Sequence, residues 1–533
     1  MRRLTVGTVV VWGLACGAPW SSEADPEHLD QELEALEAQR QALHRAERQM
    51  VEDRIETGEA SPEVWLLAER LGLDVPPQPP WSPAAMDGRE AGVSKDHARA
   101  ILDGVRREYR VDVDEALWGG AAAEALGVEA WTTPEAAIDQ AIASGRDESE
   151  AVVVGVEAAL HALDPWTRPV WPAQVAAWSQ HHEGVSVGAG IELDQAPDGA
   201  LVVTSIHEDS TAWTQGLHVG DRLLRVGDVE VSAVDAALAA LAGEPGTAHE
   251  LTVLRGEREL RITVQSESLA RRTVFGWRHH ESGHGDQDGR VSGAYKMRDG
   301  SAYVRVTSFV PDSDEELGRL VGDGPVARVV LDLRGNPGGD VQASLNVADA
   351  WLDDGVVIRM DGRAAPEPEP PGPGEAAWNE AVAGGPFVGA CTAVLVDGET
   401  ASAAEILAGV LQQRAGAIVI GSPTAGKAVS QALRADEDLG VAWQVTNLAW
   451  ALPDGTTLVL GEGVTPDVLY ETTPAEAWQT ARMAAERQAP KEHPDGTPVP
   501  WLGPVVGEGF PVLTGDPMVV RARKELLERC RDR

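Results

Sequence analysis

The chain has 533 residues, with 85 acidic and 44 basic side chains and a formal net charge of −41 at pH 7. This charge argues against a nucleic-acid backbone as the partner, because phosphate binding needs clustered lysine and arginine. The length predicts two or three domains, and a hydrophobic content of 43% is ordinary for globular ones.

The first residues have the composition of a secretory signal peptide. A short basic start precedes an apolar run over residues 4–15, which is too short to cross a bilayer as a helix. Cys16 follows directly, and the tetrad GLAC that it ends resembles a bacterial lipobox, in which the cysteine is lipidated. Gly13 departs from that motif, so cleavage around Ala18 without lipidation is the alternative.

Helical patterns dominate the chain up to residue 182. Residues 22–58 are rich in Glu, Gln, Arg and Ala, with leucines at a roughly helical period, which predicts a solvated helix or a short coiled coil. A proline-rich linker follows over residues 75–92, and helical patterns resume from residue 95. From residue 184 the chain changes to short alternating runs separated by glycines, with one helical segment at 233–242. This pattern predicts a compact β-rich domain.

The second half of the chain alternates strand-like and helix-like segments. Apolar runs such as ARVVLDLRG predict strands, a helix is expected from about residue 340 to residue 352, and a charged helix over 516–533 ends the chain. This alternation indicates an α/β core. Cys391 opens an apolar strand and is expected to be a small buried residue; it pairs with Cys530 only if folding brings the two together.

Three short motifs in this half contain residues capable of chemistry. The first, LDLRGNPGGD, spans residues 331–340 and leads from an apolar strand through glycines into a helix. Such a turn exposes backbone N–H groups at a helix start, where an oxyanion is stabilised. The alternative is an ordinary strand-to-helix turn that uses glycine for positive φ.

The second motif, TASAAE at residues 400–405, surrounds Ser402 with small residues where a strand enters a helix. The absence of bulk leaves room for a substrate backbone, and the amide that follows the serine can face a developing oxyanion. The alternative is a serine that only caps the helix.

The third motif, GSPTAGKAVSQ at residues 421–431, places Lys427 among glycine and alanine after an apolar strand. A lysine buried there has a lowered pKa, and its neutral amine can accept the proton of a serine hydroxyl. Gln431 can hydrogen-bond this amine and orient it without adding charge. A solvated surface lysine is the alternative; a phosphate-binding loop is rejected because the spacing and the Ser/Thr after the lysine are missing.

Together and in this order, the motifs resemble the C-terminal processing (tail-specific) serine proteases, which carry a PDZ domain. The resemblance runs from about residue 148 to residue 468 and includes ALHALDPWT, GVSVGAGIEL, VVLDLRGNPGG and GEGVTPDV besides the serine and lysine motifs. The site residues that it implies are Ser402 as nucleophile, Lys427 as general base, Gln431 as its orienting partner, and the amides of Ala403 and of Gly338 or Gly339 as oxyanion hole.

The resemblance also implies a way of binding substrate. In a PDZ domain an extended C-terminus adds as a strand to a sheet edge, and its carboxylate meets backbone amides. Here the peptide would lie beside the helix at 233–242. The implied peptide-binding residues are Val187, Gly188, Gly190, Ile191 and Leu193. The alternative is a PDZ domain that gates or docks the enzyme without gripping a tail.

A competing motif, HESGH at residues 280–284, fits the H-E-x-x-H pattern of zinc proteases. That chemistry needs a helix, so that both histidines share one face. Gly283 and Gly285 interrupt any helix here, and a polar loop is the better interpretation.

The expected architecture is mixed α/β: a protease core, ClpP/crotonase-like by the resemblance, with an inserted β-rich PDZ domain and helical N-terminal arms. The expected segments are a signal peptide (1–15), an acidic helical segment (16–74), a proline-rich linker (75–94), the N-terminal helical part of the protease (95–182), the PDZ domain (183–266), the α/β core with the dyad (267–480), and a C-terminal tail and helix (481–533).

The expected activity is cleavage of exported proteins near their C-termini, with no metal and no cofactor. The expected partners are proteins or peptides with exposed C-terminal tails and a regulatory protein, with no nucleic acid and with membrane contact only through a lipid on Cys16. The expected location is the periplasm or envelope of a bacterium. The alternative from another class is a catalytically silent adaptor that presents its PDZ domain.

Overall fold

The computed structural model describes most of the chain. The signal peptide, Cys16 and the HESGH loop lie outside the described residues, as does most of the proline-rich linker. None of the described helices is long and apolar enough to cross a membrane. The described residues are 26–56, 93–129, 133–171, 185–195, 200–270, 272–278, 295–297, 299–321, 326–362, 380–381, 384–436, 438–500 and 511–530.

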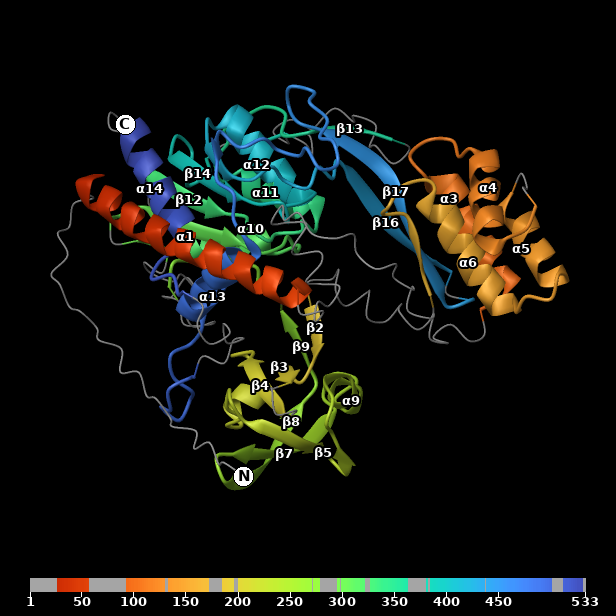
Figure 1. Cartoon of the computed structure of the whole chain (residues 1–533), viewed down its shortest axis with the longest axis horizontal. Coiled ribbons are helices and arrows are strands. Elements are labelled where there is room, and N and C mark those ends of the chain that lie inside the picture. Colours follow the sequence, from red (N-terminus) through yellow and green to blue (C-terminus); the bar gives the residue numbers. More distant parts are fainter. Residues whose placement is uncertain are drawn as a thin grey trace.

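A six-stranded sheet forms the centre of the core (Figure 1). All neighbouring strands in it are parallel except for the antiparallel pair β10 and β11. The strands are short continuous apolar runs, as expected for a parallel sheet that is buried on both faces. In spatial order they are β10 (Val274–Phe275), β11 (Ala302–Val306), β12 (Arg328–Asp332), β14 (Cys391–Val396), β15 (Ile418–Gly421) and β18 (Val468–Leu469).

Helices cover both faces of this sheet. Leu331 and Val394 point to one face, which is covered by α10 (Ser313–Val321), α11 (Val341–Ala348) and α12 (Ala403–Arg414). Val330 and Leu395 point to the other face, where α14 (Pro517–Arg529) packs. This alternation follows from the period of two along a strand. The mixed α/β prediction is confirmed.

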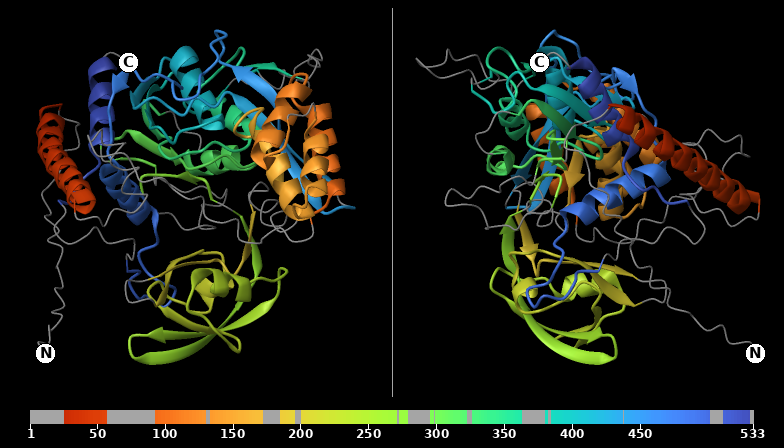
Figure 2. Two further views of the ribbon diagram at one scale, coloured as in Figure 1. Left: turned by 45° about the vertical axis from the view of Figure 1, so that its right-hand side comes forward. Right: turned by 90° about the vertical axis from the view of Figure 1, so that its left-hand side faces the viewer.

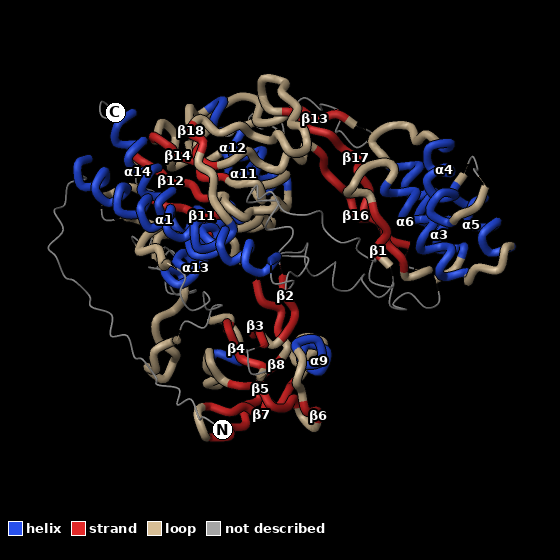
Figure 3. The backbone as a smooth tube through the Cα atoms, viewed as in Figure 1, coloured by secondary structure: helices blue, strands red, loops and turns tan. Residues whose placement is uncertain are grey.

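A bundle of helices lies at one end of the molecule and is joined to the core by long strands, as Figure 3 shows. The side chains of Asp114, Thr133 and Asp147 cap the starts of three of these helices. The bundle packs on β17, where a Cβ added at Gly104 would lie 2.1 Å from the ring of Trp443. Its helices are α3 (Lys95–Glu108), α4 (Glu115–Leu126), α5 (Pro134–Ala143) and α6 (Glu148–His161), and the strands beside it are β1 (Arg168–Val170), β16 (Val429–Asp436) and β17 (Val441–Ala451), the last of which also pairs with β13 (Arg359–Asp361).

The inserted β-rich domain is connected to the core by a stalk, which is formed by the paired strands β2 and β9 (Figure 2). Its own apolar core is separate from that of the protease part. The helix α9 contacts the edge strand β3. The elements are β2 (Val185–Gly188), β3 (Ile191–Gln195), β4 (Leu201–Ile206), α8 (Thr211–Thr214), β5 (Arg222–Val226), β6 (Val229–Glu230), α9 (Val234–Ala240), β7 (Ala248–Arg255), β8 (Arg258–Gln265) and β9 (Glu267–Ala270).

The N-terminal helix α1 (Pro26–Glu56) lies against α14 and α13 (Pro474–Gln488) (Figure 1). Leu29 and Leu36 are buried there, and the Arg40 guanidinium donates to Glu476 at 2.7 Å. The solvated helix expected from the composition therefore has one covered face. Its leucines recur every seven residues, which places them on one side of the helix.

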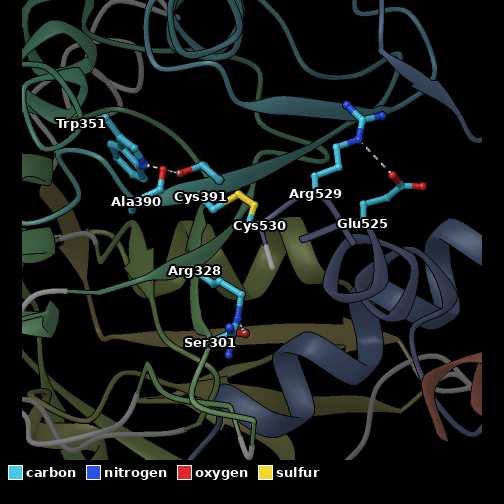
Figure 4. The surroundings of a disulfide bond; sticks show 9 residues. Ser301, Arg328, Trp351, Ala390, Cys391, Glu525, Arg529 and Cys530 are labelled. Carbon is cyan, nitrogen blue, oxygen red and sulfur yellow. Dashed lines mark hydrogen bonds and ion pairs between the residues drawn. A yellow bond between two sulfur atoms is a disulfide. The ribbon is translucent and has the colours of Figure 1, made fainter. Parts of the chain in front are cut away.

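A disulfide joins Cys391, the first residue of β14, to Cys530 at the end of α14 (Figure 4). The two Cα atoms are 6.4 Å apart. Cys391 is half-buried, so the full burial expected for it is wrong. The pairing with Cys530 that the sequence left open is formed, because α14 packs across the sheet and brings the second cysteine to the start of β14.

Candidate active site

Ser402 occupies a strained turn between β14 and α12. Its φ and ψ are 55° and −120°, and it is the one non-glycine residue with positive φ among the described residues. Such a conformation persists only where the surroundings impose it, and it is frequent at functional sites. The side chain is 7% exposed and stands at the helix start, where negative charge is favoured.

The glycine motif is bonded to the serine turn. Thr400 Oγ1 donates to the carbonyl of Leu333 at 2.9 Å, and the Ala401 amide donates to the carbonyl of Asn336 at 2.9 Å. The Asp397 carboxylate accepts from the Gly335 amide at 3.0 Å. These bonds hold the two strand-to-helix turns side by side.

Gly338 lies directly against the serine. A Cβ at this position would lie 2.9 Å from Ser402 Cβ and 3.0 Å from the amide nitrogen of Ala403, so only glycine fits. Its φ of 100° also requires glycine. Its own amide, however, donates to Asn336 Oδ1 at 2.8 Å.

The Gly338–Gly339 peptide presents its two polar groups in opposite directions. The carbonyl of Gly338 accepts from the Phe309 amide at 2.9 Å. The peptide is trans, so the N–H of Gly339 points away from Phe309. Within the described residues, neither this amide nor that of Ala403 donates to any acceptor.

Glu405 joins the serine turn to the lysine turn and is 0% exposed. One carboxylate oxygen accepts from the amides of Ser402 and Lys427, both at 2.8 Å. The other accepts from the Gly426 amide at 2.6 Å and from Thr424 Oγ1 at 2.5 Å. This residue was missed as a functional one from the sequence, although the spacing S-x-x-E of a capping box was visible there.

Lys427 is half-buried at the turn that leads into β16. Burial lowers the pKa of its amine below the ordinary value, the Asp164 carboxylate opposes this shift, and the Arg168 guanidinium adds to it. The Nζ atom lies 5.8 Å from the centre of the Trp166 ring. A larger fraction of this amine is therefore neutral near pH 7 than for a lysine in water, and only the neutral amine can accept a proton.

Gln431 lies on β16, four residues after the lysine. Its Nε2 donates to Thr446 Oγ1 at 3.3 Å. Among the hydrogen bonds of the described residues, none joins Gln431 to Lys427 Nζ and none joins that atom to Ser402 Oγ. The serine and lysine turns are thus held together through backbone groups and Glu405.

The residues expected to bind a peptide lie where the inserted domain meets its stalk. Val187 and Gly188 lie on β2, and the half-buried Ile191 and Leu193 lie on the edge strand β3. Gly190, with φ of 69°, makes the turn between these strands, and a Cβ there would lie 2.5 Å from the Cβ of Ser210.

No group of three or more His, Cys, Asp or Glu side chains is placed to hold a metal within the part of the chain that the structure describes. The HESGH motif lies outside that part.

Comparison with known families matches two parts of this chain. Residues 300–470 match the model of peptidase family S41, and this range contains Gly338, Ser402 and Lys427. The chain carries a peptidase family S41 domain. Residues 202–255 match the model of the PDZ domain, so the inserted β-rich domain is a PDZ domain, as predicted.

Proteins similar to this chain occur in staphylococci. The "Probable CtpA-like serine protease" of Staphylococcus haemolyticus is 27% identical over 326 residues, which cover 60% of this chain and 59% of that protein. The protein of the same name in Staphylococcus aureus strain COL is 27% identical over 316 residues, which cover 58% of each chain. The chain therefore matches less than two thirds of the length of these curated relatives.

Solved structures with similarity to part of this chain include two proteases. The photosystem II D1 C-terminal processing protease gives a TM-score of 0.38 at 20% identity and covers 71% of this chain and 93% of its own. The tricorn protease gives a TM-score of 0.41 at 13% identity and covers 72% of this chain and 35% of its own.

Proposed function

We propose that this protein is a serine endopeptidase that cleaves exported proteins near their C-termini through an acyl-enzyme. The observation that carries the proposal is the strained Ser402 at the start of α12, joined through the buried Glu405 to the lysine turn. A serine that only caps a helix needs neither the strain nor the link. The S41 match of residues 300–470 and the similarity to a probable serine protease support the same reaction class.

In the proposed reaction, neutral Lys427 takes the proton of Ser402 as Oγ attacks the carbonyl carbon of the scissile peptide. The ammonium then gives this proton to the leaving amine as the C–N bond breaks. A water molecule next loses a proton to Lys427 and attacks the acyl-enzyme, which releases the new C-terminus and returns the proton to Ser402.

We assign the oxyanion hole to the amides of Ala403 and Gly339. Gly338 is the weaker candidate because its N–H is already bound to Asn336 Oδ1 at 2.8 Å. Gly338 serves by its size, since any side chain there would collide with the serine turn. Donors that are fixed before the reaction stabilise the developing charge without reorganisation.

Gln431 is proposed to orient the lysine amine. Its Nε2 is held by Thr446, which leaves Oε1 as the acceptor for an N–H of Lys427. The closing of this bond belongs to the substrate-bound state, because catalytic hydrogen bonds are often long in a free enzyme.

The PDZ domain is proposed to bind the C-terminal tail of the substrate. The tail adds as a strand beside β3, next to α9, and its carboxylate meets the amides around residues 187–190. A PDZ domain that only gates activity predicts no affinity for a free tail, and titration with a peptide that ends in a free or an amidated C-terminus distinguishes the two.

The proposed location is the exported side of a bacterial envelope, where the protein is either soluble or anchored by a lipid on Cys16. The signal-like N-terminus supports export. The Cys391–Cys530 disulfide supports it independently, because such bonds persist in oxidising compartments.

The test is hydrolysis of an unstructured protein, fluorescein-labelled casein, by the wild type and by the Ser402→Ala and Lys427→Ala variants. Both variants are expected to lose at least a hundredfold in rate, because each removes a partner of the same proton transfer. Equal activity in all three contradicts the dyad. Absence of activity in all three, across substrates with varied tails, favours a catalytically silent adaptor. Cleavage that survives Ser402→Ala but is stopped by a chelator favours zinc catalysis by the HESGH motif.

A further inference from the structure

The turn formed by residues 164–167 lies against the lysine, although it belongs to the helical bundle. The centre of its Trp166 ring is 5.8 Å from Lys427 Nζ. Asp164 fixes this turn, since one of its carboxylate oxygens accepts from the amides of Trp166 and Thr167, both at 2.7 Å. The other oxygen accepts from Thr167 Oγ1 at 2.8 Å.

The same turn is bonded to the strands that carry the site. Thr167 Oγ1 accepts from the Thr446 amide at 3.1 Å, and Thr446 Oγ1 accepts from Gln431 Nε2 at 3.3 Å. Thr167 and Thr446 are 3% and 1% exposed. The chain of bonds therefore runs from Asp164 through two buried threonines to Gln431, the residue proposed to orient the amine.

We propose that Trp166 is a positioning residue for the lysine base: its ring covers Nζ and excludes water, and Asp164 holds the ring in place. This inference rests on the proposed function, in which Lys427 accepts the serine proton. Trp166 acts through Lys427 and takes no part in the proton transfer itself.

Two properties of the ring act on the amine in opposite directions. A cation over an aromatic face is stabilised by about 0.5–1 kcal/mol at an exposed site, which favours the charged form. Exclusion of water disfavours the charged form by more, since burial moves a lysine pKa by up to about 3–5 units. Burial is the dominant influence on Lys427 here, so loss of the ring raises its pKa.

The charged groups that face the amine are Asp164 and Arg168 beside the tryptophan and Glu405 on α12. Asp164 therefore has two separable roles, a charge that favours the ammonium and oxygens that hold the turn. Asp164→Asn keeps an oxygen for the two backbone amides and removes the charge. It is expected to lower the pKa of Lys427, opposite to the effect of removing Trp166.

The experiment measures kcat/KM of the full chain on fluorescein-labelled casein from pH 6 to pH 10. Trp166→Ala is expected to raise the apparent pKa of the rate by on the order of one unit, so that the rate at pH 7 falls about tenfold. The difference between the variant and the wild type is expected to shrink toward pH 10, because the amine of both proteins loses its proton as the pH rises. Trp166→Phe keeps a ring over the amine and is expected to keep the wild-type profile. Asp164→Asn is expected to shift the profile to lower pH.

A rate that falls by the same factor at every pH in Trp166→Ala overturns the proposal, because it indicates a structural loss only. An unchanged profile overturns it as well. If Trp166→Ala fails to fold, the opposite-direction shift in Asp164→Asn decides, and a shift to higher pH there contradicts the assigned roles. Full activity in Lys427→Ala is a different outcome, because it contradicts the proposed function rather than the role of Trp166.

Discussion

Glu405 connects the two turns of the site at the scale of single residues. It accepts hydrogen bonds from Ser402 and Lys427 through one oxygen and from Thr424 and Gly426 through the other. Its carboxylate is buried, so its removal leaves these donors without water to replace it. The strain at Ser402 and the direction of the lysine turn therefore depend on this side chain.

We expect Glu405→Ala to lower the free energy of unfolding by about 3 kcal/mol, the usual cost of orphaning a buried charged network. The value of kcat/KM per molecule of folded enzyme should also fall at least tenfold, because the serine turn is free to relax. Glu405→Gln keeps the shape of the side chain and one acceptor oxygen, so its stability and its rate should lie between those of the wild type and those of Glu405→Ala. Urea unfolding and kcat/KM of the folded enzyme measure both quantities.

Glu399→Ala is the matched control, since that glutamate is exposed and belongs to the same turn. It is expected to match the wild type in both measurements. Wild-type activity in Glu405→Ala would show that the serine turn is held by other contacts.

The sequence predicted part of this site and could not predict the rest. Small residues around Ser402 and glycine beside Lys427 marked both turns, because chemistry at a backbone needs room. The S-x-x-E spacing that ends at Glu405 is by itself only the signature of a helix cap, so it does not reveal the link to the lysine turn. Trp166 lies in a different part of the chain, and its place over the amine depends on how the bundle packs against β17, which no local pattern specifies.

Single elements form contacts that the sequence did not reveal. The leucines of α1 predicted an apolar stripe but not its partner, which is the pair of C-terminal helices α13 and α14. A second example is the tail strap, defined here as residues 491–499, which folds back on itself and reaches the PDZ domain (Figure 2).

Two stacked histidines hold the tail strap on the PDZ domain. The rings of His493 in the strap and His218 in the domain are 4.0 Å apart and nearly parallel, with an angle of 5° between their planes. His218 Nε2 lies 3.2 Å from the Asp495 carboxylate. Val499 packs on the PDZ core. The strap therefore ties the PDZ domain to α13 in addition to the β2–β9 stalk.

We expect acid to loosen the tail strap. Burial lowers the pKa of His493 to about 4, with the neighbouring His218 also lowering it and Asp495 opposing. The remaining charges nearby are Arg255 and Asp221. A histidine in the undocked strap has a pKa of about 6.5, so between about pH 4 and pH 6.5 the undocked state binds more protons than the docked state. The docked state is thus fully favoured above about pH 6.5 and loses stability as the pH falls toward 4.

Hydrogen exchange of residues 491–499 at pH 7.5 and pH 5, corrected for intrinsic rates, measures this effect. Protection is expected to be several-fold lower at pH 5 in the wild type, and unaffected by pH in His493→Phe, which keeps the packing but cannot titrate. Equal protection of the wild type at both pH values would contradict the role assigned to His493.

On the scale of the whole molecule, the order of the parts was predictable and their arrangement was not. The alternation of strands and helices predicted the α/β core, and the glycine-separated runs predicted the inserted β-rich domain, because both depend on local periodicity. That this domain is a PDZ domain followed only from the family resemblance. The Cys391–Cys530 bond and the packing of α1 against α14 join segments that are distant in sequence. Such contacts arise from packing of complete elements, so composition and period carry no signal for them.

The arrangement places the proposed peptide-binding strand β3 near the stalk that enters the core (Figures 1 and 2). A substrate tail bound there is attached to the same molecule that carries Ser402, which raises its effective concentration at the serine.

The central claim is that Lys427 acts as a neutral base, and the pH dependence of kcat/KM of the wild-type enzyme tests it most directly. Because burial lowers the pKa of this amine, the rate is predicted to rise with pH and then to reach a plateau. The midpoint of the rise is expected below the usual lysine pKa of about 10.5. A rate that does not change between pH 6 and pH 9 would contradict a lysine base.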